Sequence, residues 1–508
     1  MAKSETPTYI LELELDVNPS QKAWLARRLK NAKAIYNACL GKALKGLKAV
    51  LADKNYRIAV KEISRLNKIA EAKRNRFEKA SLKELKAYTK WLEKFYDYSE
   101  YSLHDFVKSV YKHYHFTSAE AQKLATRAFQ AVERVHYRKA NKVMFKGREV
   151  TISIEGKSDT SALKRVGDSV QFGKEHVFPM IVKKKDTYAE EALLDRTKYV
   201  RLLAREIRGK TRYFVQLVQD GYPPVKLERK VSYDKKKRVG LDKGVSTLAI
   251  VSEDKVQLRE LAPECQFDYR KLRIIQRAMD RSKRATNPDN FQSNGTVKKG
   301  NIDKKGKREP LKWHFSKRYG KLKNKWKELH RSVAMKRKQS HEKLANEILA
   351  LGSDIRVEDM QIQGLTKRAK KTKRNQKNGK IIRKKRYGKT VANHAPAMLV
   401  DIIDRKLGYQ RCRIKKVNTQ KVKASQYNHV TDRYTKKALS ARWNEDINGE
   451  RIQRDLYSAF LIMNTTENME KVDQALCEKH WEQFVKLHHV AIEEIKMSNN
   501  LLLRWYIG

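Results

Sequence analysis

Three acidic residues, far apart in the chain, each occupy a position where an apolar or small side chain would be the ordinary choice. Asp242 ends an apolar strand pattern, Glu358 ends another, and Asp455 lies on the apolar stripe of a helix pattern. A buried carboxylate without a partner is costly, because water no longer solvates its charge. The fold must therefore place these three residues where a cation or a polar group compensates them.

Each acid has an ordinary structural explanation when it is taken alone. Asp242 could be a turn residue, Glu358 a surface charge at a strand end, and Asp455 one half of an ion pair with Arg454. Taken together they indicate a metal site, because Mg²⁺ prefers carboxylate oxygens and a pair of such ions drives phosphodiester hydrolysis. The sequence therefore predicts Asp242, Glu358 and Asp455 as catalytic residues that bind two Mg²⁺ ions, for which Mn²⁺ could substitute.

The chain is strongly basic. Its 508 residues include 114 Lys and Arg against 58 Asp and Glu, which gives a formal net charge of +56. A charge of that size repels itself unless a polyanion neutralises it, and phosphate contacts release counterions as they form. A surface that only kept the protein soluble would need far less excess. Nucleic acid is therefore the predicted partner, and together with the three acids this predicts a metal-dependent nuclease.

The four cysteines are scattered, and no two of them form a Cys-x-x-Cys pair. The spacing predicts neither a disulfide framework nor a structural zinc site, so no zinc is expected. The N-terminal residues lack the apolar core of a signal peptide, and no apolar run approaches the ~20 residues of a membrane span. We expect a cytoplasmic protein without a membrane partner.

The N-terminal part of the chain changes its pattern twice. Within residues 9–17, apolar and acidic side chains alternate strictly from Leu11 to Val17, which predicts a half-buried strand, and Asn18 then caps a helix that begins with a proline. Residues 18–143 are helical in pattern and dense in Lys and Arg. Residues 144–225 carry short strand patterns, the clearest being a hairpin that turns at Arg208-Gly209-Lys210. This order predicts one small β domain interrupted by helices.

The C-terminal part holds all three acids. The expected elements are strands at 239–242, 247–251 and 256–258, helices around 268–286 and 311–350, a strand that ends at Glu358, a helix at 396–407, a strand at 410–417, and the helix of Asp455. The first acid lies on the first strand, the second follows a helix and the third lies on a late helix. That is the element order of the ribonuclease-H-like α/β fold.

A basic segment from Lys367 to Lys389 lies between the second acid and the next helix, and it contains no Asp or Glu. It is too charged and too rich in Gly and Asn to pack into a core. A plain solvated loop is the alternative, but its place in the chain predicts that it holds nucleic-acid phosphates near the acids. The nucleic-acid-binding residues that we expect there are Lys370, Lys371, Lys373 and Arg374.

Three motifs surround the acids: Gly240-Leu241-Asp242-Lys243-Gly244, Arg356-Val357-Glu358-Asp359-Met360 and Gln453-Arg454-Asp455-Leu456-Tyr457-Ser458-Ala459-Phe460. They resemble the three RuvC motifs of the transposon-encoded TnpB proteins and the type V CRISPR effector nucleases. The N-terminal strand followed by Asn18-Pro19-Ser20-Gln21 also looks like the opening of that family. The resemblance extends over nearly the whole chain.

The resemblance implies a multi-domain protein that combines an α/β nuclease domain with all-α and β-barrel parts. The implied domains are 1–17, the first strand of a wedge-like β-barrel; 18–143, an inserted helical recognition region; 144–230, the rest of the barrel; 231–423, a split ribonuclease-H-like (RuvC) nuclease with two motifs; 424–449, a degenerate zinc ribbon; and 450–508, the third motif and a C-terminal helix.

One departure from the family concerns the segment 424–449. Family members usually carry two Cys-x-x-Cys pairs there, and this chain has no cysteine in it. Two outcomes are open. The segment either packs as a metal-free loop through Tyr427, Tyr434 and Trp443, or becomes disordered.

By the same resemblance, the protein is expected to be an RNA-guided DNA endonuclease of the prokaryotic cytosol or nucleoid. It would bind a structured guide RNA, recognise a short motif beside the target, and cleave double-stranded and single-stranded DNA at one RuvC-like site. Two alternatives are a guide-dependent DNA-binding regulator with little cleavage and an RNA-independent, structure-selective nuclease. Regulators of that kind usually lose one of the acids, and the long basic helical region argues against the second alternative.

Overall fold

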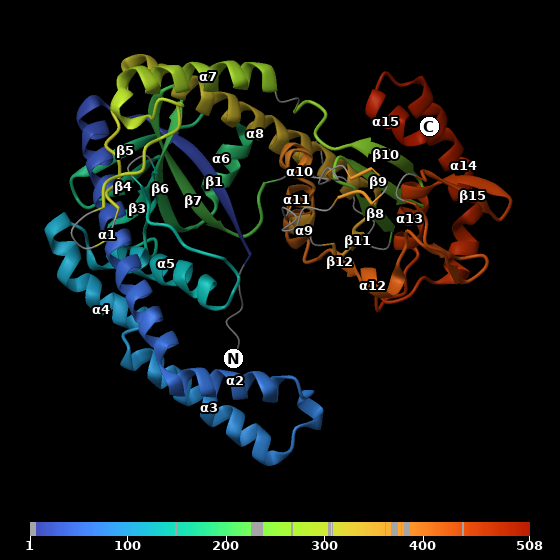
Figure 1. Cartoon of the computed structure of the whole chain (residues 1–508), viewed down its shortest axis with the longest axis horizontal. Coiled ribbons are helices and arrows are strands. Elements are labelled where there is room, and N and C mark those ends of the chain that lie inside the picture. The colour runs from blue at the N-terminus through green and yellow to red at the C-terminus, as the bar shows by residue number, and fades with distance from the viewer. Residues whose placement is uncertain are drawn as a thin grey trace. The chain divides into compact units, whose positions relative to one another are not determined.

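The computed structural model describes residues 7–147, 150–224, 237–265, 268–302, 306, 308–360, 362–366, 374–376, 378–379, 381, 387–438 and 441–508. The chain divides into two compact units, Met1–Lys226 and Leu227–Gly508 (Figure 1). Within the described ranges, no helix combines the length and the apolarity that crossing a membrane requires.

The described part of the first unit contains a seven-stranded antiparallel sheet in the order β2-β6-β7-β1-β5-β4-β3. Its strands are β1 (Thr8–Leu15), β2 (Ile154–Glu155), β3 (Leu163–Val166), β4 (Ser169–Phe172), β5 (His176–Ile181), β6 (Thr197–Ile207) and β7 (Lys210–Asp220). The sheet curls until β3 contacts β6, which makes a nearly closed barrel.

Two sequence predictions for this unit are confirmed. Leu11, Leu13 and Leu15 are buried along β1, as the strict alternation predicts. The hairpin of β6 and β7 turns where predicted, with positive φ angles of 51° at Arg208 and 77° at Gly209. A glycine suits the second position, because it adopts positive φ without a steric penalty.

The helices of the first unit are α1 (Pro19–Ala52), α2 (Lys54–Asn67), α3 (Arg76–Phe95), α4 (Glu100–Tyr111), α5 (Ser118–His136) and the short α6 (Thr187–Leu194). The predicted start of α1 is confirmed. The Asn18 side chain accepts a hydrogen bond from Gln21 N, and the Gln21 side chain accepts one from Asn18 N. This capping box satisfies two backbone N–H groups that a helix start leaves unpaired. Helices α2 and α3 lie side by side beyond the end of α1 (Figure 1).

The second unit is built on a sheet that has five strands among the described residues, in the order β10-β9-β8-β11-β12. The strands are β8 (Arg238–Lys243), β9 (Thr247–Ser252), β10 (Val256–Glu260), β11 (Asp354–Glu358) and β12 (Lys415–Val417). The first three form the predicted antiparallel meander. Strand β11 is parallel to both β8 and β12.

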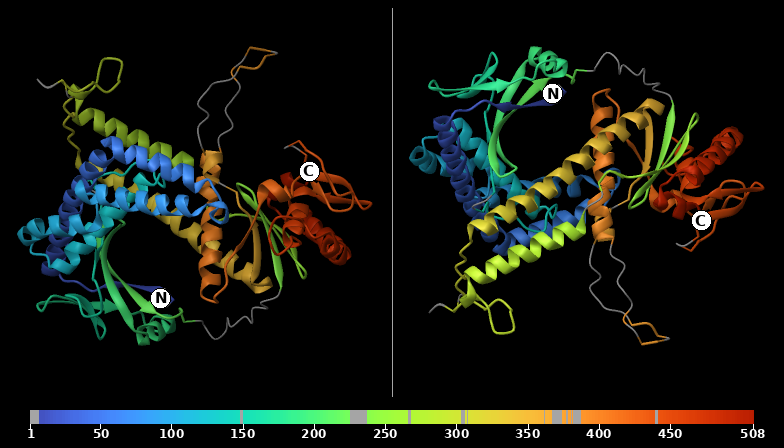
Figure 2. Two further views of the ribbon diagram at one scale, coloured as in Figure 1. Left: turned by 90° about the horizontal axis from the view of Figure 1, so that it is seen from below. Right: turned by 90° about the horizontal axis from the view of Figure 1, so that it is seen from above.

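Alternation divides this sheet into two faces. Val239, Leu241, Ile355 and Val357 point to one face, where they pack with α8 (Lys317–Leu351) and α11 (Pro396–Gly408). The other face packs with α13 (Arg454–Met463), α14 (Gln474–Met497) and α15 (Leu501–Ile507). Figure 2 shows the sheet between α11 and the C-terminal helices. The even-numbered residues of β8 and β11 therefore face α13.

The remaining elements of this unit are short, apart from α7 (Tyr269–Thr286), which packs on α8. They are α9 (Ile362–Thr366), α10 (Gly388–His394), α12 (Thr419–Val422), β13 (Tyr427–Asn428), β14 (Arg433–Tyr434), β15 (Trp443–Ile447) and β16 (Glu450–Gln453).

Two expected element bounds are wrong. The helix expected from residue 311 begins at Lys317, because the Ser316 side chain accepts a hydrogen bond from Tyr319 N and caps the helix there. The strand expected at 410–417 shortens to β12, because Arg411 adopts a left-handed φ of 61° and turns the chain first.

In its described residues, the cysteine-free segment 424–449 forms the hairpin β13–β14 and contributes strand β15 to a second hairpin, whose other strand, β16, lies just after the segment. The Tyr427 and Tyr434 rings pack with their centroids 4.9 Å apart. Trp443 donates through its indole N–H to the carbonyl oxygen of Ile507, 2.9 Å away. Of the two open outcomes, the structure therefore shows the packed one.

Candidate functional site

Asp242 and Glu358 lie beside each other on neighbouring strands. The parallel register of β8 and β11 pairs Leu241 with Val357, so one further residue along both strands sets Asp242 beside Glu358. Both residues have even numbers, and both therefore face α13. Each is half-buried, so a ligand can still reach part of its surface.

Asp455 approaches this pair from above the sheet, because Gly240 lets α13 come unusually close. A Cβ atom at residue 240 would lie 2.0 Å from the Ala459 carbonyl oxygen and 2.6 Å from Met463 N. From that contact, two residues along β8 span ~6.6 Å and four residues back along α13 span ~6 Å. The two steps have similar lengths, and the negative charge of Asp455 does act on Asp242.

The pKa shifts of the acids are consistent with this placement. Burial raises the pKa of Asp242 well above its ordinary value, and the negative charges of Glu358 and Asp455 raise it further, while Arg454 opposes them. Burial also raises the pKa of Glu358, with Lys243 acting in the opposite direction. Like charges in a poorly solvated place disfavour ionisation. The three predicted acids therefore interact through space.

The structure separates Glu358 from its acidic neighbour. Asp359 is exposed and lies 3.7 Å from Lys416, an ordinary surface ion pair. Glu358 forms no ion pair or side-chain hydrogen bond among the described residues, and neither does Asp242 or Asp455. The ordinary explanation of Asp455, an ion pair with Arg454, is therefore absent from the described part of the chain.

The donor set fits hard divalent cations, since it offers carboxylate oxygens and no sulfur or imidazole ligand. Among the described residues, no three His, Cys, Asp or Glu side chains are close enough to hold one ion together. Mg²⁺ does not require this, because it is usually bound through one or two carboxylates, with waters and substrate phosphates completing its shell. The carboxylates of Asp242, Glu358 and Asp455 can thus be divided between two ions.

The start of α13 is fixed by residues that sequence reasoning missed. Gln453 caps the helix by accepting a hydrogen bond from Leu456 N, 2.8 Å away. Gln453 N in turn donates to Nε2 of buried His488, 3.0 Å away. The sequence could have indicated the role of Gln453, because this glutamine directly precedes a helix pattern and can cap it. The residues around His488 in the sequence do not indicate that it binds Gln453.

Of the four predicted nucleic-acid-binding residues, Lys370, Lys371 and Lys373 lie outside the described residues. Arg374 is described; it is exposed and forms an isolated antiparallel bridge with Ile381. The structure therefore places Glu358 and Asp455 near Asp242 and leaves the basic residues as a prediction.

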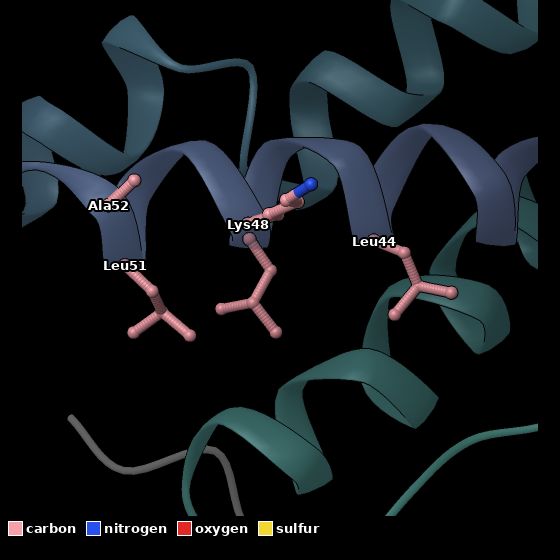
Figure 3. Close-up of a pocket in the computed structure, with 5 residues that line it drawn as sticks. Leu44, Lys48, Leu51 and Ala52 are labelled. Atoms are coloured by element: carbon pink, nitrogen blue, oxygen red, sulfur yellow. The ribbon is translucent and has the colours of Figure 1, made fainter. Parts of the chain in front are cut away.

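A surface pocket in the first unit differs in character from the site of the acids. It measures about 460 Å³ and lies along α1 in the first unit, lined by Leu44, Leu47, Lys48, Leu51 and Ala52. Figure 3 shows Leu44 and Leu51 on the same side of that helix. Four of its five lining residues are apolar and none is acidic, so it offers no metal ligand.

Two buried histidines make this unit sensitive to acid. Burial lowers the pKa of His429, which bonds the Tyr457 hydroxyl through Nδ1 at 2.7 Å, to about 4, and burial does the same for His488. A histidine with a lowered folded pKa stabilises the fold above its unfolded pKa of ~6.5, and that stability is lost as pH falls towards about 4.

We therefore expect His488→Gln to weaken the pH dependence of thermal unfolding. The protein should lose about 2 kcal/mol per buried histidine between pH ~6.5 and ~5, because each pH unit corresponds to about 1.4 kcal/mol. Melting curves of both proteins over this range measure the difference. Parallel pH profiles for the two proteins would contradict the assignment.

Comparisons with known proteins give no family assignment. No family model matches the chain, and no curated protein matches it. Among solved structures, it is similar to a Cas12f1–sgRNA–target DNA complex at 12% identity, covering 89% of this chain and 98% of that chain, with a TM-score of 0.41. A CRISPR-Cas12f ternary complex matches at 13% identity over 88% and 82% of the two chains, with a TM-score of 0.22.

Proposed function

We propose that this protein is an RNA-guided DNA endonuclease that cuts at the site of Asp242, Glu358 and Asp455. One observation carries the proposal: two strands and a helix, distant in sequence, bring Glu358 and Asp455 near Asp242, and no described side chain forms an ion pair or hydrogen bond with any of the three carboxylates. Such a cluster is costly without cations and becomes useful with them.

The sheet supports a ribonuclease-H-like assignment of the second unit. A meander of three strands carries the first acid on β8, and β11, which carries the second, is parallel to β8. Helix α13, with the third acid, covers the same face of the sheet. This is the element order that the motifs imply, with α7 and α8 inserted between the meander and β11.

In this proposal three residues provide metal ligands and a fourth positions one of them. Asp242 and Glu358 provide carboxylates from the sheet, and Asp455 provides one from the first turn of α13. Two Mg²⁺ ions, or Mn²⁺ in their place, would supply a nucleophilic water at neutral pH and stabilise the charge on the attacking and leaving oxygens. Gln453 holds the first turn of α13, and so holds Asp455 towards the sheet.

The partners follow from the motif resemblance and from the charge. We propose a guide RNA and a DNA target, double-stranded and single-stranded, for a protein of +56 net charge. Lys370, Lys371, Lys373 and Arg374 are proposed to contact their phosphates. The protein would act in the prokaryotic cytosol or nucleoid. The retention of all three acids favours cleavage over a purely DNA-binding role.

The test is to sequence the RNA that co-purifies with the protein and then to change its guide segment. Cleavage of DNA that follows the new guide supports the proposal. Cleavage of branched DNA by the RNA-free protein, unaffected by any guide, would show that the protein is a structure-selective nuclease. Guide-dependent binding without cleavage in Mg²⁺ or Mn²⁺ would show that it is a regulator.

We expect the purified protein to contain no stoichiometric zinc. His429 is buried and its Nδ1 is hydrogen-bonded to the Tyr457 hydroxyl, and segment 424–449 contains no cysteine that could complete a zinc site with it. Elemental analysis after exhaustive dialysis checks this, and a zinc-selective chelator should leave the melting temperature unchanged. About one zinc per chain would contradict it.

A further inference from the structure

An arginine inside the second RuvC-like motif is completely buried. Arg356 lies two residues before Glu358 on β11, and the register pairs it with Gly240 on β8, so its side chain lies on the face covered by α13. Arginine is almost never fully buried unless it is paired. Arg356 is the neighbour of Glu358 on the same face of β11, so its buried charge must be paired by acceptors close to a proposed metal ligand.

The guanidinium of Arg356 connects the sheet to the chain that leaves α13. Nη1 donates to the carbonyl oxygen of buried Thr465, just after the helix ends at its cap Asn464. Nη2 donates to Asp354 Oδ2 at 2.8 Å and to Glu467 Oε1 at 2.6 Å. One side chain thus holds the C-terminal end of α13 to β11.

Neighbouring strands contribute to the same cluster. Lys415 on β12 donates to Glu467 Oε2 at 2.8 Å and to Asp354 at 3.1 Å, and Arg238 on β8 donates to Glu467 at 2.8 Å. Hydrogen bonds from Lys415 and Arg356 hold the pKa of Glu467 at about 2. Glu467 therefore remains ionised at neutral pH, and the cluster joins three strands to the segment after α13.

We infer that Arg356 is a positioning residue that sets the distance from Asp455 to Asp242 and Glu358, an inference that rests on the proposed function. Helix α13 has Asp455 in its first turn and is held by Arg356 just after its last turn. Between these points Gly240 permits close packing but provides no bond of its own. The planar guanidinium serves several acceptors in fixed directions, which a lysine ammonium cannot reproduce.

The test compares Arg356→Lys and Arg356→Met with the wild type, each bound to its guide RNA. Groups that hydrogen-bond a metal ligand directly contribute about 10- to 100-fold in metal affinity or activity, and Arg356, which acts through α13, should fall at the lower end of that range. We expect Arg356→Lys to weaken Mn²⁺ binding, followed by electron paramagnetic resonance without DNA, by about ten-fold. The Mn²⁺ concentration for half-maximal cleavage should rise equally, and Arg356→Met should show a larger effect. Excess Mn²⁺ should restore most of the rate of Arg356→Lys.

The matched control is Arg259→Lys, since Arg259 forms an exposed ion pair with Glu347 at 3.1 Å and should tolerate the change. The inference is overturned if Arg356→Lys binds Mn²⁺ as the wild type does. It is also overturned if cleavage falls in proportion to guide binding and excess Mn²⁺ does not restore it, which is the result for a merely structural residue. Failure of the proposed function is distinguishable, because Asp242→Ala would then retain Mn²⁺ binding and cleavage.

Discussion

Asp242→Ala should reduce single-turnover DNA cleavage by about a thousand-fold or more, and Asp455→Ala should do the same. Metal ions stabilise a hydrolytic transition state by several kcal/mol, and about 4 kcal/mol corresponds to that factor in rate. Guide RNA and target binding should change little, because these carboxylates do not contact phosphates without the ions. Cleavage rates and binding constants, measured on the same preparations, separate the two effects.

The chain offers a matched control for this prediction. Asp359 is exposed and lies near Lys416, so Asp359→Ala removes the same charge next to Glu358 while keeping all three of the proposed metal ligands. It should cut normally, whereas Glu358→Ala should not. Full cutting by Asp242→Ala in Mg²⁺ would refute the site, and loss of cutting in Asp359→Ala would show that the second acid is misassigned.

Gly240→Ala should damage both the stability and the chemistry of the second unit. The added methyl group would lie 2.0 Å from the Ala459 carbonyl oxygen and 2.6 Å from Met463 N. Both atoms belong to the helix backbone, which cannot rotate away, so α13 must shift. Overpacking of this kind costs about 1–3 kcal/mol, or roughly 2–12 °C in melting temperature. Because α13 holds Asp455, cleavage should fall more than stability alone explains.

The opposite result is expected for Gly320→Ala in α8. A Cβ atom at residue 320 meets nothing within 4 Å, and alanine favours a helix over glycine by up to about 1 kcal/mol. This variant should melt at an equal or higher temperature and cut normally. If Gly240→Ala behaved like Gly320→Ala, the close approach of α13 to β8 would not be what positions Asp455.

Local patterns predicted much of the fold correctly. The alternation of Leu11, Leu13 and Leu15 predicted β1, and the cap at Asn18 predicted the start of α1. These signals succeed because side-chain period and helix capping depend on residues a few positions apart. The same signals do not predict the first residue of β12, because that strand begins only after the left-handed turn at Arg411.

For the site, the sequence by itself determined which residues are candidates, since three carboxylates stand in apolar patterns with motifs around them. Only the tertiary structure decided that Glu358, and not Asp359, lies beside Asp242, because strand register is a contact between distant segments. It also decided the roles of Gly240 and Arg356. The space next to a glycine and the partners of a buried arginine are set by α13, more than a hundred residues from β8, and no local pattern encodes them.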